Sequence, residues 1–187
     1  DLQLQFKNRE VEKRYIALVH GLITADEGIV EHRIMRIGSF GKFGIAGLRD
    51  EGREARTDFK VDGRYNIKED VFEQALLQQE RTLNKARINY LKKNAKIYTL
   101  LSVFPKTGRT HQIRVHLKSI GHPIVSDLIY SPGKLIKFDL LWSPRLFLHA
   151  TFLKFRHPAT KKDMEFESKL PADIASTLKK LKSIGKV

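Results

Sequence analysis

The stretch at residues 106–127 constrains the fold of this chain more than any other part of the sequence. The run before it, residues 95–104, is rich in β-branched and aromatic residues and predicts a strand. Gly108 can adopt backbone angles that are closed to other residues, so a sharp turn out of that strand is predicted around it. A helix is then predicted over residues 111–120, because its apolar residues recur at helical spacing.

The predicted helix has two different faces. The apolar positions share one face, which we expect to pack: Ile113, Leu117 and Ile120. The polar positions on another face are His111, Arg114 and Lys118. A threonine of the turn, Thr107 or Thr110, is expected to cap the helix, and Gly121 with Pro123 is expected to end it.

The order of residues in this stretch is also specific. It runs Thr107-Gly108-Arg109-Thr110-His111-Gln112-Ile113-Arg114-Val115-His116, followed by Gly121-His122-Pro123-Ile124-Val125 and Asp127. This order resembles the signature of the RluA-type RNA pseudouridine synthases nearly letter for letter. An amphipathic helix with a solvated basic face is the simpler interpretation. Against it, the polar residues include arginine and histidine, which make directional contacts, where a solvated face would more often carry lysine and glutamate.

Further stretches resemble the same family. They are Lys13-Arg14-Tyr15 with Ala17-Leu18-Val19 and Gly21, Gly52-Arg53-Glu54-Ala55-Arg56-Thr57-Asp58-Phe59, and Leu148-His149-Ala150 with His157-Pro158. The resemblance implies an α+β domain with a mixed, mostly antiparallel sheet and packed helices. It also implies that Tyr15 stacks on the target uracil, which a flat ring can do with a base turned out of its helix. Without the resemblance, a tyrosine in a strand is more often a packing residue.

The family implied by these motifs isomerises uridine to pseudouridine in structured ribosomal or transfer RNA, without a cofactor or a metal. Breaking the bond between base and ribose needs a nucleophile or base at the sugar, normally an aspartate carboxylate. That carboxylate needs a cation beside it to stay ionised and oriented. The resemblance assigns this role to Arg114, so the catalytic residues expected in this chain are Arg114 and Tyr15. A structural salt bridge is the alternative for Arg114.

The catalytic aspartate of the family has no counterpart in this sequence. It belongs to an Arg-Leu-Asp run followed by Thr-Ser-Gly, which does not occur here, and Asp1 is too close to Tyr15 to replace it. We therefore interpret residues 1–187 as a single, partial catalytic domain, the C-terminal part of a longer synthase, and expect no turnover from this chain alone. The alternative is a non-catalytic RNA-binding or ribosome-associated protein on the same fold.

The chain is strongly basic. It contains 35 Lys and Arg against 21 Asp and Glu, which gives a formal net charge of +14. Such an excess favours a polyanionic partner, and RNA before an anionic membrane surface. On charge and position we expect four cations to contact phosphate: Lys106, Arg109, Lys118 and Arg145.

The rest of the chain is predicted to alternate between strands and helices. Helices are predicted at 1–10 and 173–184, strands at 11–21, 29–37, 52–61 and 144–158, a hairpin partner of the last at 163–168, and loops at 38–44 and 131–143. Between about 66 and 94 the sequence departs from the family, and a rough helical stripe in a polar setting predicts a helical insertion. The stripe consists of Phe72, Leu76, Leu83 and Tyr90. Its polar face is expected to be solvated, with an RNA or partner contact as the alternative.

Several other functions have no support in the sequence. Cysteine is absent, which excludes disulfides and thiolate zinc sites and is compatible with a reducing compartment. His111, His116 and His122 turn to different sides of the predicted helix, so we expect no metal site from them. No apolar run approaches the roughly 18 residues that a membrane helix needs. We expect a monomer without a cofactor, located in the cytoplasm, with an organelle as the alternative.

Overall fold

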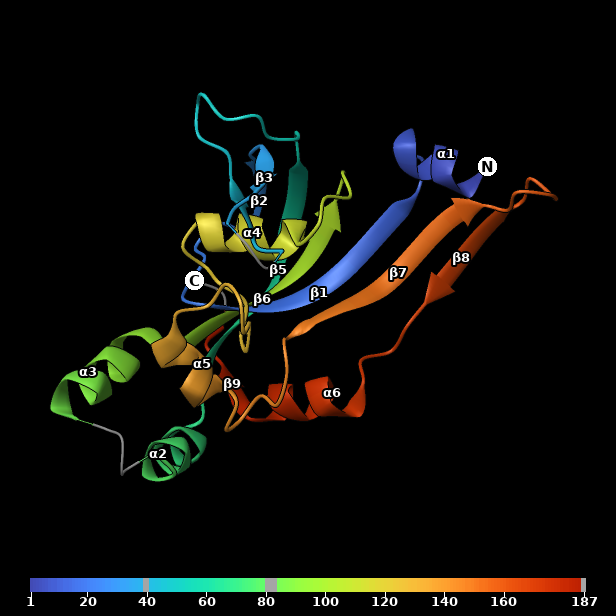
Figure 1. Ribbon diagram of the computed structural model, residues 1–187. Coiled ribbons are helices and arrows are strands. Elements are labelled where there is room, and N and C mark those ends of the chain that lie inside the picture. The colour runs from blue at the N-terminus through green and yellow to red at the C-terminus, as the bar shows by residue number, and fades with distance from the viewer. Residues whose placement is uncertain (39–40, 80–83, 186–187) are drawn as a thin grey trace.

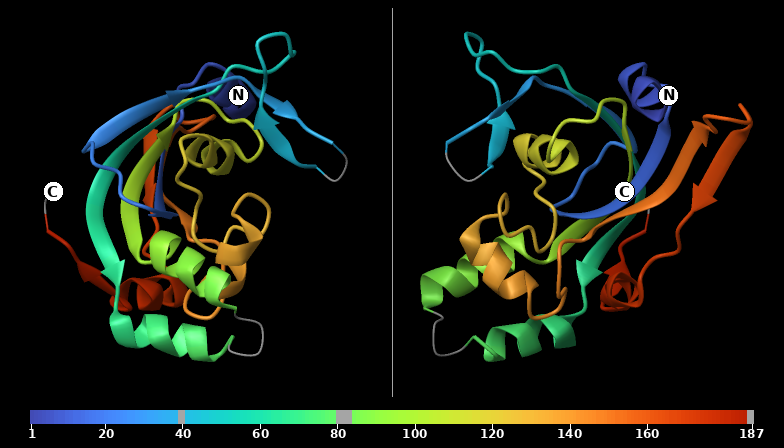
Figure 2. Two further views of the ribbon diagram at one scale, coloured as in Figure 1. Left: turned by 90° about the vertical axis from the view of Figure 1, so that its left-hand side faces the viewer. Right: turned by 45° about the vertical axis from the view of Figure 1, so that its right-hand side comes forward.

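The computed structural model describes residues 1–38, 41–79 and 84–185. It is built on a curved sheet (Figures 1 and 2). The strands run in the order β2 (Glu27–Glu31), β5 (Arg56–Ile67), β6 (Ile97–Pro105), β1 (Glu12–His20), β7 (Leu148–Arg156) and β8 (Asp163–Glu167), and β9 (Leu181–Ser183) also pairs with β5. Every pairing among these described strands is antiparallel. The predicted α+β class is confirmed, with an antiparallel sheet.

The described helices lie around this sheet (Figures 1 and 2). They are α1 (Leu2–Lys7), α2 (Glu69–Leu77), α3 (Lys85–Asn94), α4 (Gln112–Ser119), α5 (Gly133–Asp139) and α6 (Ala172–Lys179). In Figure 1, α2, α3 and α5 gather at one end of the molecule and α1 lies at the other. A separate small sheet pairs β3 (Ile34–Arg36) with β4 (Phe43–Ile45). Within the described ranges, no helix combines the length and the apolarity needed to cross a membrane.

Strand β1 anchors the sheet. Its apolar run Ala17-Leu18-Val19 is fully buried, as expected of a strand covered from both sides. It pairs with β6 on one side and with β7 on the other. Because Tyr15 lies on this strand, its position is set by the best-buried part of the fold.

The single strand predicted at 29–37 is wrong, because the structure has two strands there that belong to different sheets. Strand β2 ends at Glu31, opposite Arg56 of β5, and the chain then enters the separate sheet of β3 and β4. The division has a packing cause, since Ile34 is buried in a second small core together with Tyr130, apart from the main core. A pattern of apolar residues does not distinguish one strand from two that belong to different sheets.

Both predicted loops contain regular structure. The loop predicted at 38–44 overlaps β4, and its residues 39 and 40 lie outside the described part of the chain. The loop predicted at 131–143 contains α5, because Leu135 and Phe138, three positions apart, are both buried on one face of a helix. Helix α5 has only 7 residues, too few to show a clear periodicity in the sequence.

Three predicted boundaries also differ from the structure. Strand β5 begins later than predicted and continues to Ile67. Strand β7 begins at Leu148, because the amide of the preceding Phe147 bonds the Val125 carbonyl at 3.0 Å. The helix predicted at 173–184 ends early, and Leu181 is paired with Ile67 in β9 instead. The predicted hairpin of β7 with β8 is confirmed.

Two helices, α2 and α3, occupy most of the stretch 66–94 for which helix is predicted. Of the predicted stripe, Phe72 and Leu76 are buried and Tyr90 is half-buried, while position 83 lies outside the described residues. The ring of Phe72 packs against Phe138 of α5, with centroids 5.2 Å apart. Both helices therefore pack against the main core, α2 through Phe72 and α3 through Leu91. That the stretch is an insertion stays a prediction.

Candidate functional site

The turn that leads into α4 is organised by the side chain of Gln112. Its amide group donates to the Arg56 carbonyl at 2.9 Å and to the Thr57 hydroxyl at 3.0 Å. Its carbonyl oxygen accepts from the Thr107 hydroxyl at 2.6 Å and from the Arg109 amide at 3.0 Å. All four hydrogen-bonding positions of this buried side chain are thus used. Together they join β5 to the start of α4 and fix how the helix begins.

The left-handed residue of this turn is His111, whereas the sequence predicted special backbone angles at Gly108. His111 has φ of +56° and is the N-cap of α4, and no side-chain hydrogen bond caps the helix there. The predicted caps are therefore wrong, and Thr107 bonds Gln112 instead. His111 is held in this uncommon conformation by a bond of 2.8 Å between its Nδ1 and the Tyr130 hydroxyl.

His116 is an uncharged side chain that connects α4 to the sheet by hydrogen bonds. Its Nδ1 lies 2.9 Å from the Thr57 hydroxyl, and its Nε2 lies 3.4 Å from the His32 carbonyl. Because a carbonyl only accepts, Nε2 carries the proton and Nδ1 accepts from the hydroxyl. Burial lowers the pKa of His116 to about 4. At neutral pH the side chain is therefore uncharged, and both of its ring nitrogens are hydrogen-bonded.

Arg114 forms a bidentate ion pair with Asp127. Its Nε lies 2.8 Å from Oδ2 and its Nη2 lies 2.6 Å from Oδ1. The amides of Ile129 and Tyr130 also donate to Oδ1, each at 3.0 Å. Burial alone would raise the pKa of Asp127, but the hydrogen bonds from Arg114 and the two amides outweigh it and hold the pKa below its usual value. Asp127 therefore stays ionised and orients Arg114.

Tyr130 contacts several side chains on the polar face of α4. The guanidinium carbon of Arg114 lies 4.8 Å from its ring centroid and the Lys118 ammonium 5.9 Å. Its hydroxyl accepts from the Phe43 amide at 3.0 Å, which leaves the hydroxyl hydrogen for Nδ1 of His111. Burial, and then Arg114, lower the pKa of His111, in keeping with an acceptor nitrogen. The polar side chains predicted on one face of the helix, His111, Arg114 and Lys118, therefore all contact the Tyr130 side chain.

Tyr15 lies on the same face of the sheet as α4. In the strand register Tyr15 is opposite Val103, and Val103 is opposite Phe59, so the three side chains share a face. Thr57, two positions from Phe59, shares that face and bonds a side chain of α4. Tyr15 is half-buried. The two side chains predicted to be catalytic therefore come from one side of the sheet.

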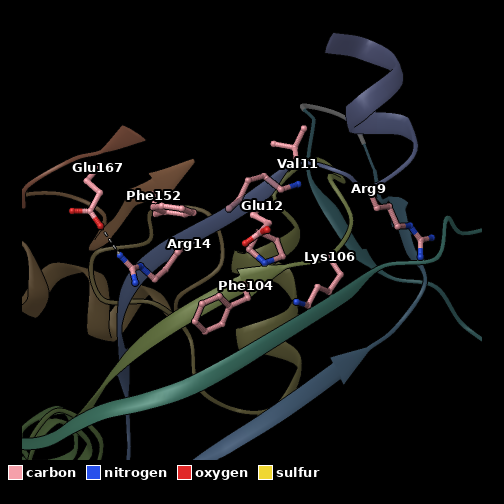
Figure 3. Close-up of a pocket in the computed structure, with 10 residues that line it drawn as sticks. Arg9, Val11, Glu12, Arg14, Phe104, Lys106, Phe152 and Glu167 are labelled. Atoms are coloured by element: carbon pink, nitrogen blue, oxygen red, sulfur yellow. Dashed lines mark ion pairs between the residues drawn. The ribbon is translucent and has the colours of Figure 1, made fainter. Parts of the chain in front are cut away.

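Lys106 lies on the opposite face. Its Nζ is 3.7 Å from the carboxylate of Asp58, which strand alternation directs away from α4. Figure 3 shows Lys106, Arg14 and Phe104 around a pocket of about 390 Å³, with the ion pair of Arg14 to Glu167 at its rim. The structure therefore separates Lys106 from Tyr15, and a phosphate held by Lys106 would lie behind the sheet.

The other cations predicted to contact phosphate are divided between two regions. Arg109 and Lys118 lie at the two ends of α4, and Arg109 lines a pocket of about 540 Å³ with two further arginines. Arg145 lies elsewhere and pairs with Asp173 of α6. The structure does not bring Arg145 to the other predicted residues. All four phosphate contacts stay predictions.

The histidines considered as metal ligands have separate partners. His111 bonds Tyr130, His116 bonds Thr57, and Nδ1 of His122 lies 2.8 Å from the His20 carbonyl. Among the residues that the structure describes, no group of three or more potential ligands could hold a metal ion.

Sequence reasoning assigned no role to Asp127, Tyr130 or Gln112, although these residues organise the site. One signal was available for Asp127, since an aspartate that accepts from amides two and three positions on is typical of a turn. The contacts of Tyr130 and Gln112 carry no such signal, because they reach Phe43 and Thr57 in distant parts of the chain.

A basic α+β domain with a fixed arginine and a half-buried tyrosine on one side of its sheet fits the class of nucleic-acid-binding domains. A family model described as RNA pseudouridylate synthase matches residues 1–119. The chain belongs to the RNA pseudouridylate synthase family. The predicted resemblance is thereby confirmed.

Two similar proteins are also named as pseudouridine synthases. The chain is 34% identical over 181 residues to an uncharacterized RNA pseudouridine synthase, YlyB, of Bacillus subtilis, a match that covers 97% of the chain and 48% of the relative. It is 34% identical over 172 residues to ribosomal large subunit pseudouridine synthase C of Buchnera aphidicola, covering 90% of the chain and 45% of the relative. The chain thus spans about half the length of these relatives.

A solved structure supports the fold. Human RNA pseudouridylate synthase domain containing 1 superposes with a TM-score of 0.72 at 24% identity, over 99% of this chain and 64% of the human chain. At this identity the likeness shows that the two share a fold.

Proposed function

We propose that the protein to which this chain belongs isomerises uridine to pseudouridine in RNA. The reaction breaks the N1–C1′ bond, turns the base and forms a C5–C1′ bond. The C5 proton leaves and N1 regains a proton, so the reaction needs no oxidant or reductant. Family membership supports this activity.

The observation that carries the proposal is the way in which Asp127 holds the guanidinium of Arg114. Two of its guanidinium nitrogens bind Asp127, and within the described residues Nη1 has no hydrogen-bond partner. The side chain is 13% exposed, and Nη1 is not among the fully buried polar atoms that lack a partner in the described part of the chain. A guanidinium held in this way presents a fixed charge with unused N–H donors. It would orient the catalytic carboxylate, supplied from outside residues 1–187, and keep it ionised at C1′ of the target ribose.

Tyr15 would stack on the target uracil. Its ring packs against the main core, which limits its motion, and part of it is accessible. Among the described residues its hydroxyl has no hydrogen-bond partner, so the accessible part of the ring is not committed to another contact. A base turned out of an RNA helix is commonly held by such a ring. The position of Tyr15 on the α4 side of the sheet supports joint action with Arg114.

The proposed substrate is structured ribosomal or transfer RNA. The net charge of +14 supports a polyanionic substrate, and one relative has a name that refers to the ribosomal large subunit. We further propose that the protein acts as a monomer without a cofactor, in the cytoplasm or in an organelle. The four predicted cations would contact phosphates of one RNA at different places: Arg109 and Lys118 beside α4, Lys106 behind the sheet and Arg145 near α6.

One observation favours a second candidate function, RNA binding without catalysis. Asp127 already provides Arg114 with a buried carboxylate from the same chain, which is the arrangement of a structural ion pair. In that case Arg114 would need no other carboxylate, and the basic surface would account for the whole function.

Release of tritium from RNA labelled at C5 of uridine separates the two candidates, because isomerisation removes the hydrogen at C5. The full-length protein is expected to release tritium from a ribosomal or a transfer RNA, and residues 1–187 alone are expected to bind RNA without release. A full-length protein that binds both RNAs and releases tritium from neither would support the second candidate. Release by residues 1–187 alone would show that no outside carboxylate is needed.

A further inference from the structure

Helices α3 and α5, away from the site, carry five exposed lysines and no exposed carboxylate. The lysines are Lys85, Lys92 and Lys93 of α3 and Lys134 and Lys137 of α5, and we call them the α3–α5 basic face. The sequence has no acidic residue from 84 to 96, and Asp139 is the only one from 128 to 145. Asp139 is fully buried and bonds His20 at 2.9 Å, so it does not offset the surface charge.

Helices α3 and α5, which carry these lysines, lie side by side (Figures 1 and 2). The ammonium of Lys134 lies 5.0 Å from the ring centroid of Tyr90, which joins α5 to α3. On α3, Lys85, Lys92 and Lys93 follow the spacing of one helical stripe, and Leu91 is buried on another side. From Lys85 to Lys93 the stripe extends about 12 Å at the rise of an α-helix.

None of the five lysines has a carboxylate within ion-pair distance among the described residues. Elsewhere, lysines do have such partners: the exposed Lys161 lies 2.6 Å from Asp1, and the half-buried Lys96 lies 2.8 Å from Glu69. No carboxylate in the described part of the chain therefore balances the five charges of the basic face.

Helix dipoles do not explain this distribution. Lys92 and Lys93 lie in the last turn of α3, where a cation is favourable. Lys85 and Lys134 lie in the first turns of their helices, where a cation is unfavourable, and neither first turn contains an acidic residue. In contrast, α2 and α6 have acidic first turns. Lysines at two unfavourable positions indicate a role that the folded chain alone does not provide.

We propose that the α3–α5 basic face binds the phosphate backbone of the RNA substrate, at a place outside the uridine-binding site. This proposal rests on the proposed function and adds a second contact surface to it. A polyanion would supply the missing charge, and a stripe of this length can contact several consecutive phosphates. A membrane surface fits less well, because the stripe of α3 lacks the broad exposed apolar face of a membrane-bound helix.

Two variants of the full-length protein with equal charge test this proposal. The first replaces the five lysines of the basic face with glutamine, K85Q/K92Q/K93Q/K134Q/K137Q, which preserves helix propensity. The control replaces five exposed lysines elsewhere that form no ion pair with any described residue, K7Q/K162Q/K169Q/K179Q/K182Q. Binding of a labelled RNA hairpin with single-stranded flanks is measured over a range of salt, with circular dichroism to confirm folding. Binding to phosphatidylserine vesicles is measured in parallel.

The first variant is expected to bind the hairpin at least about tenfold more weakly, with a salt slope reduced by about 3, and the control is expected to change much less. Equal losses in both variants would overturn the proposal, because only net charge would then matter. Vesicle binding that depends on the five lysines, with unchanged RNA affinity, would also overturn it. A parent protein that does not bind the hairpin would count against the proposed function itself.

Discussion

Arg114 in α4 and Asp127 in the turn beyond it are joined by two hydrogen bonds, of 2.8 Å and 2.6 Å, across a chain reversal that contains Gly121 and Pro123. The carboxylate is fully buried, whereas 13% of the Arg114 side chain is exposed. A buried negative charge thus fixes the direction of a cation that is only partly exposed. Such a pair can serve stability and catalysis at once, and the two roles can be separated by experiment.

Substitution Asp127→Ala is expected to lower the free energy of unfolding by about 3–5 kcal/mol, since it leaves a largely buried guanidinium without its partner. Two backbone amides also lose their acceptor. Urea denaturation measures the change. The matched control is Asp173→Ala, which breaks the exposed pair with Arg145 and is expected to have little effect. Equal effects of the two substitutions would mean that the Asp127 pair is not buried in solution.

Stability is expected to depend on His116 between pH 6.5 and pH 4. Burial lowers the pKa of His116 from 6.5 to about 4, so in this range the unfolded chain binds more protons than the folded one. The free energy of unfolding therefore decreases as the pH falls through this range, by about 3 kcal/mol for the full shift.

His116→Gln is expected to reduce this pH dependence, because the variant has no group at that position to protonate. The measurement is the difference in urea denaturation between parent and variant across the range. A constant difference would contradict the prediction. Asp127 acts at lower pH: its pKa is below 3.8 in the fold, so its contribution is present above that value and is lost only as the pH falls below it.

Arg114→Lys in the full-length protein tests the catalytic role separately from charge. Lysine retains the positive charge but lacks the planar fork that binds Asp127 with two nitrogens and leaves a third free. We expect kcat for tritium release to fall on the order of 100-fold, with RNA affinity close to that of the parent. Arg156→Lys, at an exposed ion pair with Asp163, is the control and is expected to retain the parental rate. A parental kcat for Arg114→Lys would remove Arg114 from the mechanism.

The sequence predicts those parts of the fold in which apolar residues recur at regular spacing along the chain. Strands β1 and β6 and helix α4 have apolar residues at regular spacing, and the structure contains all three. Helix α5 and strand β9 were missed, because each is short and is stabilised by distant partners: Phe138 packs on Phe72, and Leu181 pairs with Ile67. Short elements of this kind depend on tertiary contacts more than on their own propensity.

The same distinction holds for the site. Arg114 was found from its motif, but its partner Asp127 was not, because the chain reversal between them hides their proximity. The left-handed residue was expected at a glycine, yet it is His111, since the bond to Tyr130 offsets the cost of that conformation. The common face of Tyr15 and α4 follows only from the strand register, which a single sequence does not reveal.

Tyr15→Ala and Tyr15→Phe in the full-length protein test the proposed stacking. Phenylalanine retains the flat ring, whereas alanine removes it, and stacking of one base on such a ring is worth about 1–3 kcal/mol. We therefore expect Tyr15→Ala to lower kcat/KM for tritium release by about 10- to 100-fold, and Tyr15→Phe to retain the affinity of the parent for substrate RNA.

The control is Tyr65→Ala, because Tyr65 is also half-buried and packed on the main core but lies near the far end of β5. It is expected to lower stability as Tyr15→Ala does, without the loss in kcat/KM. If Tyr15→Phe lost RNA affinity as fully as Tyr15→Ala, the hydroxyl rather than the ring face would be the group that contacts RNA, and stacking would be the wrong interpretation of this residue.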